Sequence, residues 1–117
     1  MPQQLSPIPS FSFTEHKVGK KWVDGKDIYE KTIDFGNLPN YNNKTVEHGI
    51  TNLDKIISLT GIAVQDDNYI PLPATANSSS WSIELGASDT MISISTQSDR
   101  SDYYGYITVY YTKTEEV

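Results

Sequence analysis

The chain has no cysteine among its 117 residues. This absence excludes disulfide bonds and thiolate metal sites as sources of stability. A domain built without them is held together by packing, with assembly into an oligomer as a further contribution. The length itself predicts a single domain, because about 100 to 200 residues per domain is the usual range.

Positive charge is scarce as well. Nine Lys and Arg residues stand against fifteen Asp and Glu residues, which gives a formal net charge of -6. A protein that binds nucleic acid normally presents a basic surface to the phosphates, so we expect no nucleic-acid partner. Anionic membrane surfaces are disfavoured as partners for the same reason.

No apolar run approaches the roughly 18 to 20 residues that a membrane-spanning helix needs, and the first ten residues lack a signal-peptide pattern. The sequence therefore predicts no membrane insertion.

Residues for catalysis are also few. The only histidines are His16 and His48, and neither lies in a recognisable pattern with a nucleophile, a base or a metal ligand. His48 precedes a glycine in a turn-like context that suits a backbone hydrogen bond. We therefore expect a protein without enzymatic activity.

Three pairs of aspartates raise the question of calcium, which favours oxygen ligands on loops. None of them matches a defined calcium loop such as the EF-hand, and each is read more simply as a pair of solvated turn residues. The pairs are Asp24 with Asp27, Asp66 with Asp67, and Asp99 with Asp102. We expect no metal and no cofactor.

The clearest local pattern is a β-hairpin around Asp24-Gly25, where glycine can supply the positive φ that a two-residue turn requires. In the segment that follows, side chains alternate with the two-residue period of a half-buried strand. Tyr29, Ile33 and Phe35 fall on one face of it. These three residues are the expected core side.

Further strands are predicted at 45–48, 56–64, 69–72, 81–85, 92–95 and 104–111, separated by turn-forming residues. Pro71 and Pro73 confine the strand at 69–72 to a sheet edge or a strand end. Trp81 shares a face with Ile83 and Leu85 and is expected in the core. One helical turn at most is predicted, at 52–54.

With about seven strands and no convincing helix, the expected fold is an all-β, antiparallel β-sandwich of jelly-roll or related topology. We expect this single domain to span 15–117. Residues 1–14 are rich in proline, which favours extended backbone, and they are read either as a linker or as a flexible terminus.

The strand at 104–111 carries three tyrosines, Tyr104, Tyr106 and Tyr110, on the face opposite Ile107 and Val109. Tyrosine buries apolar area and keeps a hydroxyl for a partner. Three interpretations stay open for this tyrosine face: packing between strands, a subunit interface, or direct contact with a ligand.

Two other places are candidates for ligand recognition. Trp22 lies beside the hairpin turn, where it either packs or serves as a platform for a sugar ring. The segment 98–103 offers Asp99, Arg100, Asp102 and Tyr103 in a short turn that we expect to be exposed. The alternative for this loop is an Asp–Arg ion pair that only shapes the turn.

Four blocks of sequence carry a family resemblance. They are EHKVGKKWVDGKDIYEKTIDFG at 15–36, HGITNLDKII at 48–57, IPLP at 70–73, and SDRS at 98–101 before the tyrosine-rich strand. In this order they resemble a domain of bacteriophage tail-fibre and other receptor-binding or baseplate proteins, over roughly residues 15–114. The resemblance implies a compact β-sandwich knob, commonly at the carboxyl end of a trimeric fibre.

The function implied is attachment of the virion to a host cell-surface saccharide, by a homotrimer that also contacts other virion tail proteins. The protein would be made in the bacterial host cytoplasm and end in the virion tail. The alternative is a purely structural virion domain, such as a fibre cap, docking or trimerisation module, with no ligand of its own.

Overall fold

The computed structural model describes residues 12–74 and 82–114. Every regular element in these ranges is a β-strand. The eight strands are β1 (His16–Lys21), β2 (Asp27–Asn37), β3 (Asn43–Glu47), β4 (Leu53–Gln65), β5 (Asn68–Leu72), β6 (Ile83–Ala87), β7 (Met91–Thr96) and β8 (Tyr104–Lys113).

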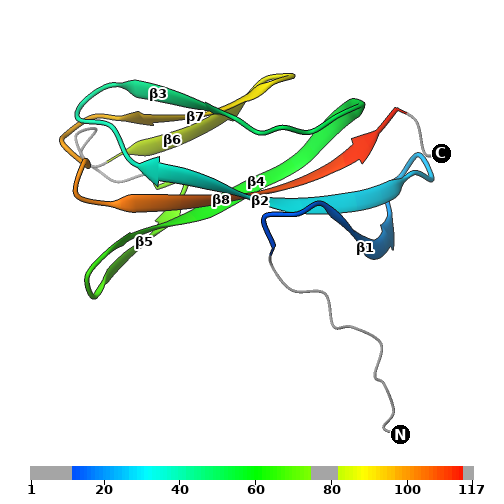
Figure 1. Cartoon of the computed structure of the whole chain (residues 1–117), viewed down its shortest axis with the longest axis horizontal. Helices are drawn as coiled ribbons and strands as arrows, with labels where there is room; N and C mark the ends of the chain where they lie inside the picture. Colours follow the sequence, from blue (N-terminus) through cyan, green and yellow to red (C-terminus); the bar gives the residue numbers. More distant parts are fainter. Residues whose placement is uncertain (1–11, 75–81, 115–117) are drawn as a thin grey trace, which may run out of the picture.

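The strands form two antiparallel sheets, a larger one in the order β1-β2-β8-β4-β5 and a smaller one in the order β3-β7-β6. The smaller sheet lies over one end of the larger sheet, and the β1–β2 hairpin lies at the other end (Figure 1). This arrangement confirms the predicted all-β antiparallel sandwich. The described residues contain one strand more than the seven expected and no helical turn at 52–54, where Asn52 has a positive φ and β4 begins at Leu53.

The predicted hairpin forms at β1–β2, but its loop has three residues and not two. The Gly25 N–H donates to the Trp22 carbonyl, and the Trp22 N–H donates to the Lys26 carbonyl. Gly25 has a φ of 90°. It is therefore the left-handed residue that follows the turn in a three-residue loop. The Asp24 carboxylate accepts the Lys26 N–H at 3.0 Å and so closes the turn from inside.

The core lies between the two sheets. Tyr29, Ile33 and Phe35 are all buried, as the alternation in β2 predicted. The other buried apolar side chains come from both layers and from the segment after β2, and are Leu38, Ala63, Leu72, Ile83, Ile92, Ile94, Ile107, Val109 and Tyr111. Trp81 lies outside the described residues.

Other local predictions hold at the edge of the larger sheet. β5 is an edge strand, as its proline required. Asp66 and Asp67 form the two-residue turn that leads into it, and Asp66 has a φ of 50°. Of the predicted linker, residues 1–11 lie outside the described residues, whereas the Ser12 carbonyl already accepts the Thr32 N–H of β2.

β8 lies in the middle of the larger sheet, paired with β2 on one side and β4 on the other. Ile107, Val109 and Tyr111 point into the core, whereas Tyr104, Tyr106 and Tyr110 alternate with them and lie on the outer face. β8 therefore joins the core to the surface on which the tyrosines lie.

The close approach of β4 to β8 at Gly61 generates the first prediction. A Cβ at Gly61 would lie 2.6 Å from the Tyr106 carbonyl oxygen and 2.7 Å from Ile107 Cδ1. Gly61→Ala is expected to lower the free energy of unfolding by about 1–3 kcal/mol, measured by chemical denaturation. Gly86→Ala is the matched control, because its Cβ would meet only the rotatable Ser93 hydroxyl. Equal unfolding midpoints for the two variants would contradict the close approach.

Candidate functional site

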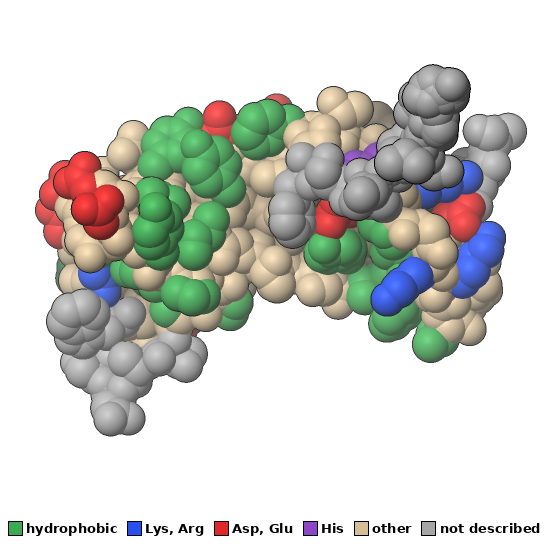
Figure 2. Space-filling view, turned by 90° about the horizontal axis from the view of Figure 1, so that it is seen from below, with side chains coloured by type: hydrophobic (Ala, Val, Ile, Leu, Met, Phe, Trp, Pro, Cys, Tyr) green, Lys and Arg blue, Asp and Glu red, His purple; other side chains and the backbone are tan. Residues whose placement is uncertain are grey.

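The outer face of the larger sheet, the side away from the smaller sheet, carries an apolar area. Figure 2 views the molecule from this side and shows hydrophobic side chains gathered over one half of the face. Phe13 is 57% exposed, Tyr69 64% and Tyr106 36%. Exposed apolar area gathered on one face is typical of an interaction surface or a ligand-binding groove.

A groove with a volume of about 610 Å³ lies on this face. Small-ligand sites usually have volumes of roughly 300–1,000 Å³. The residues that line the groove come from the segment before β1 and from the three central strands of the sheet, and are Ser12, Phe13, Thr32, Thr60, Gly61, Ile62, Tyr106 and Thr108. We call this the outer-face groove.

Register brings the hydroxyl groups of the outer-face groove into a row. Thr108 of β8 is directly opposite Thr32 of β2 on one side and Thr60 of β4 on the other. The Thr32 and Thr108 hydroxyl oxygens lie 2.9 Å apart and share a hydrogen bond. Both threonines are only 8% exposed, so this hydroxyl pair lies deep in the sheet surface.

Aromatic rings stand beside the hydroxyl row. The rings of Phe13 and Tyr106 are stacked, with centroids 6.3 Å apart and planes at 24°. Tyr104 also packs on Tyr106, with ring centroids 5.3 Å apart and planes tilted by 53°. Its hydroxyl donates to the Asp34 carboxylate at 2.6 Å, and this hydrogen bond is the first cause of a raised Tyr104 pKa. Tyr106 therefore contacts two aromatic neighbours, and it remains 36% exposed.

A buried acid lies farther along the same face. The Glu30 side chain is 8% exposed, and its carboxylate pairs with His16 Nε2 at 2.8 Å. A hydrogen bond to Glu30, with burial as a further cause, raises the Tyr110 pKa to about 12. The Tyr110 hydroxyl is thus hydrogen-bonded to a carboxylate of the same chain. Of the three predicted interface tyrosines, only Tyr106 lines the outer-face groove.

The predicted recognition loop, residues 98–103, is tied to the segment that follows β2. Asn40 and Asp99 form an isolated bridge, and the Arg100 N–H donates to the Pro39 carbonyl. The Asp99 carboxylate accepts both the hydroxyl and the N–H of Ser101; these bonds, the hydroxyl first, lower the Asp99 pKa.

The loop pattern predicted an exposed Arg100, and this prediction is wrong, because Arg100 is buried with only 8% of its surface exposed. Its guanidinium lies 5.8 Å from the centre of the Tyr103 ring, and Tyr103 is half-buried. Asp102 is exposed. Burial of the guanidinium leaves little of it to meet a ligand, because the side chain has folded back onto the body of the domain.

Trp22 is half-buried in the β1–β2 hairpin. The loop 98–103 leads into β8 at Tyr104, whereas the hairpin lies next to the start of β2, which pairs with the far end of β8. The structure therefore places the two predicted recognition elements at opposite ends of the β2–β8 ladder and does not bring them together.

His48 is 2% exposed and has a structural role. Its Nδ1 accepts the Ile50 N–H at 3.1 Å, which leaves Nε2 to donate to the Ser88 carbonyl at 3.0 Å. Nδ1 thus shapes the segment after β3, and Nε2 joins that segment to the β6–β7 turn. This agrees with the backbone hydrogen bond expected for it.

Within residues 12–74 and 82–114, no group of three or more His, Cys, Asp or Glu side chains is arranged to hold a metal ion. The same residues include no helix long and apolar enough to cross a membrane.

Phe13, Thr32, Thr60, Ile62 and Thr108 were not named as site residues from the sequence. Thr108 lies within the predicted tyrosine face, and Thr32 shares the outward face of β2. The sequence did not show that β8 pairs with β2 and β4. This pairing brings together Thr32 and Thr108, which are 76 residues apart in the chain. Strand register was the missing information.

Comparisons of the chain with models of known protein families, with curated proteins and with solved structures found no match.

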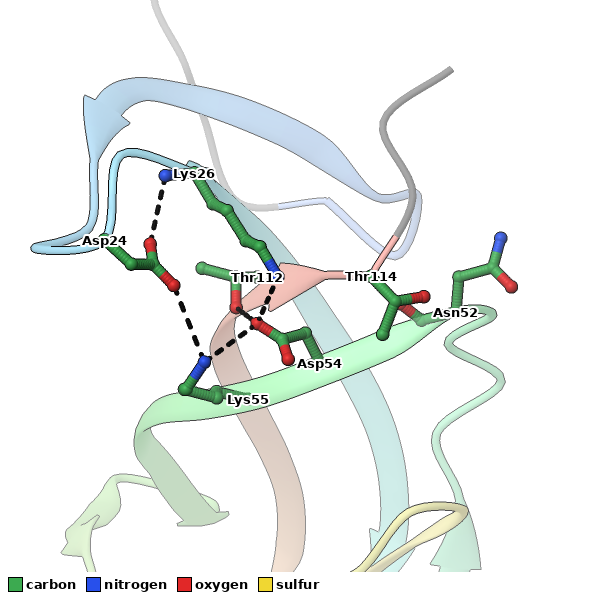
Figure 3. Close-up of polar contacts among 7 residues, drawn as sticks. All are labelled: Asp24, Lys26, Asn52, Asp54, Lys55, Thr112 and Thr114. Carbon is green, nitrogen blue, oxygen red and sulfur yellow. Dashed lines mark hydrogen bonds and ion pairs between the residues drawn. The ribbon is translucent and has the colours of Figure 1, made fainter.

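A separate charged cluster joins the β1–β2 hairpin to β4 and β8 (Figure 3). The Asp54 carboxylate accepts hydrogen bonds from Lys26 at 2.9 Å, Lys55 at 3.1 Å and the Thr112 hydroxyl at 2.9 Å. Lys55 also pairs with Asp24 at 3.5 Å. Because these contacts join the hairpin to β4 and β8, the cluster braces the hairpin against the sheet.

The Asp54 cluster generates the second prediction. Hydrogen bonds from Lys26, Thr112 and Lys55 lower the Asp54 pKa from 3.8 to about 2. A carboxylate whose pKa is lower in the folded state stabilises the fold above its unfolded pKa, and this contribution is lost as the pH falls through its folded pKa. Asp54→Asn should therefore lower the melting temperature at pH 7 and flatten its fall between about pH 4 and pH 2.

The control for this experiment is Asp67→Asn, which changes an exposed acid in the β4–β5 turn. Its melting temperature should follow the unmodified chain at both ends of the pH range. An Asp54→Asn variant with the unmodified pH profile would show that the three hydrogen bonds do not stabilise the ionised carboxylate.

Proposed function

We propose that this chain is a non-enzymatic receptor-binding domain of a bacteriophage tail fibre, which attaches the virion to a glycan on the host cell surface. The observation that carries the proposal is the outer-face groove, in which an exposed tyrosine ring stands beside a row of threonine hydroxyls. Sugar rings present apolar C–H patches and hydroxyl groups together, and this lining offers a counterpart to each.

The sequence resemblance to phage receptor-binding and tail-fibre domains supports the same function. In that setting the domain is part of a homotrimer in the virion tail, after synthesis in the bacterial host cytoplasm, and contacts other tail proteins. Several copies on one fibre would raise the effective concentration of each site for a host surface, so a weak single site suffices for attachment.

The third prediction tests the groove directly. Tyr106→Ala should weaken binding to a glycan array about tenfold, because loss of the ring face removes an interaction of about 1.4 kcal/mol. Tyr69→Ala is the matched control, since Tyr69 is a more exposed tyrosine of the neighbouring edge strand that does not line the groove. The absence of binding to any glycan by the unmodified oligomer would refute the proposed function.

A second function, a structural module of the fibre, is favoured by the same exposed apolar side chains, Phe13, Tyr69 and Tyr106. In this alternative the outer face is buried between copies of the chain, and Tyr104, Tyr106 and Tyr110 belong to the interface. The free chain would then be an oligomer held by this face.

The fourth prediction separates the two functions through mass in solution. If the domain binds a glycan through the groove, Tyr106→Ala should keep the oligomeric mass of the unmodified chain, as measured by light scattering, and weaken only glycan binding. Conversion of an oligomer to a monomer by the same substitution would assign the face to subunit assembly. Tyr41→Ala serves as the control for a general effect of removing a surface aromatic, because Tyr41 is exposed in the segment between β2 and β3.

A further inference from the structure

We infer that the outer-face groove selects a neutral pyranose, which packs its C–H groups against the exposed part of the Tyr106 ring and hydrogen-bonds to the Thr32–Thr108 hydroxyl pair. The inference rests on the proposed function and goes beyond it, because it names the chemical class of glycan. It comes from three properties of the groove: its charge, its hydrogen-bonding capacity, and its position within the sheet.

Charge is the first property. None of the described residues that line the groove is charged. Two acids flank Thr32 on the same face of β2: Asp34, which lies directly opposite Tyr106 and is exposed, and Glu30, which pairs with His16. The chain as a whole carries a formal charge of -6. A uronic acid or a phosphorylated polymer would meet a negative potential without a cation in the described lining to pair with it. The groove therefore favours an uncharged ligand.

Hydrogen-bonding capacity is the second property. Each threonine hydroxyl has one donor and two lone pairs. The Thr32–Thr108 bond consumes one donor and one lone pair, so one O–H and three lone pairs remain between the two oxygens. A sugar hydroxyl also donates and accepts. One such group can thus meet both the remaining donor and a lone pair at the same point.

Position within the sheet is the third property. The floor of the groove is formed by β2, β8 and β4, and each of these strands has a hydrogen-bonded neighbour on both sides. A peptide that binds by adding a strand needs an unpaired edge, which this floor lacks. Recognition here depends on side chains, and these are ring faces and hydroxyls.

Phe13 and Tyr106 both line the groove, and their rings are stacked, with centroids 6.3 Å apart and planes at 24°. Phe13 therefore covers part of the Tyr106 ring, and a sugar would pack its C–H groups against the part that stays exposed, beside the threonine row. This contact needs the Tyr106 ring and does not need its hydroxyl.

The test uses the full chain and a matched pair of oligosaccharides that end either in a neutral hexose or in the uronate of the same hexose. Binding of each is measured by titration calorimetry. We expect the neutral oligosaccharide to bind at least about tenfold more tightly. Tyr106→Phe should keep this binding, and Tyr106→Ala should weaken it about tenfold. Thr108→Val should weaken it severalfold, because it removes one hydroxyl and keeps nearly the same side-chain shape. Asp34→Asn should reduce the difference in affinity between the neutral oligosaccharide and the uronate, because it removes a negative charge beside the groove.

A tighter complex with the uronate, or unchanged neutral binding in Tyr106→Ala, would overturn this inference and leave attachment to a glycan intact. Failure of the unmodified chain to bind any member of a wider glycan array would overturn the inference together with the proposed function. Circular dichroism and melting temperature establish that each variant is folded, and Tyr69→Ala controls for the loss of an exposed ring.

Discussion

The alternation of side chains along β8 is the constraint on which both the core and the groove depend. Ile107, Val109 and Tyr111 point inward, while Tyr106 and Thr108 point outward from the same strand. Because successive side chains of a strand point to opposite faces, a register slip of one residue would expose the isoleucine and bury the tyrosine. The apolar core thus fixes the register that places Thr108 between Thr32 and Thr60. The arrangement of the groove on the outer face therefore depends on the packing of the core on the inner face.

Electrostatics has a supporting role in this fold. The ion pairs formed by Lys17, Lys21 and Lys55 lie at the surface, where pairs of this kind contribute little to stability. The exceptions join elements far apart in sequence: Asp54 fixes the hairpin to β4, and Lys113 reaches Glu15 before β1 at 2.7 Å. Burial disfavours the charged Glu15, but hydrogen bonds from Lys113 and Tyr111 prevail, so its pKa is lowered. These contacts hold the first hairpin, and with it Phe13, against the sheet.

Sequence reasoning predicted the features that depend on neighbouring residues. Alternation identified the core side of β2, proline placed β5 at an edge, and Asp24-Gly25 marked the hairpin. It could not predict the features that depend on distant pairing. Arg100 looked like an exposed loop residue because its sequence neighbours are polar, yet contacts with the segment after β2 bury it. The groove escaped prediction for the same reason, since its threonines come from three strands that only the register of the sheet aligns.

A groove in the middle of a sheet limits the strength of the binding that it can provide. Its floor presents no unpaired backbone groups, so a ligand gains only ring contacts and a few hydroxyl hydrogen bonds, each worth about 1 kcal/mol net. Interactions of this size give a weak and readily reversible single site. Weakness is compatible with attachment when copies are linked, because each bound site raises the effective concentration of the next. A reversible site also allows a particle to sample a surface before it is held by many contacts. In the proposed function, an assembly of several copies would compensate for the weak binding of each groove.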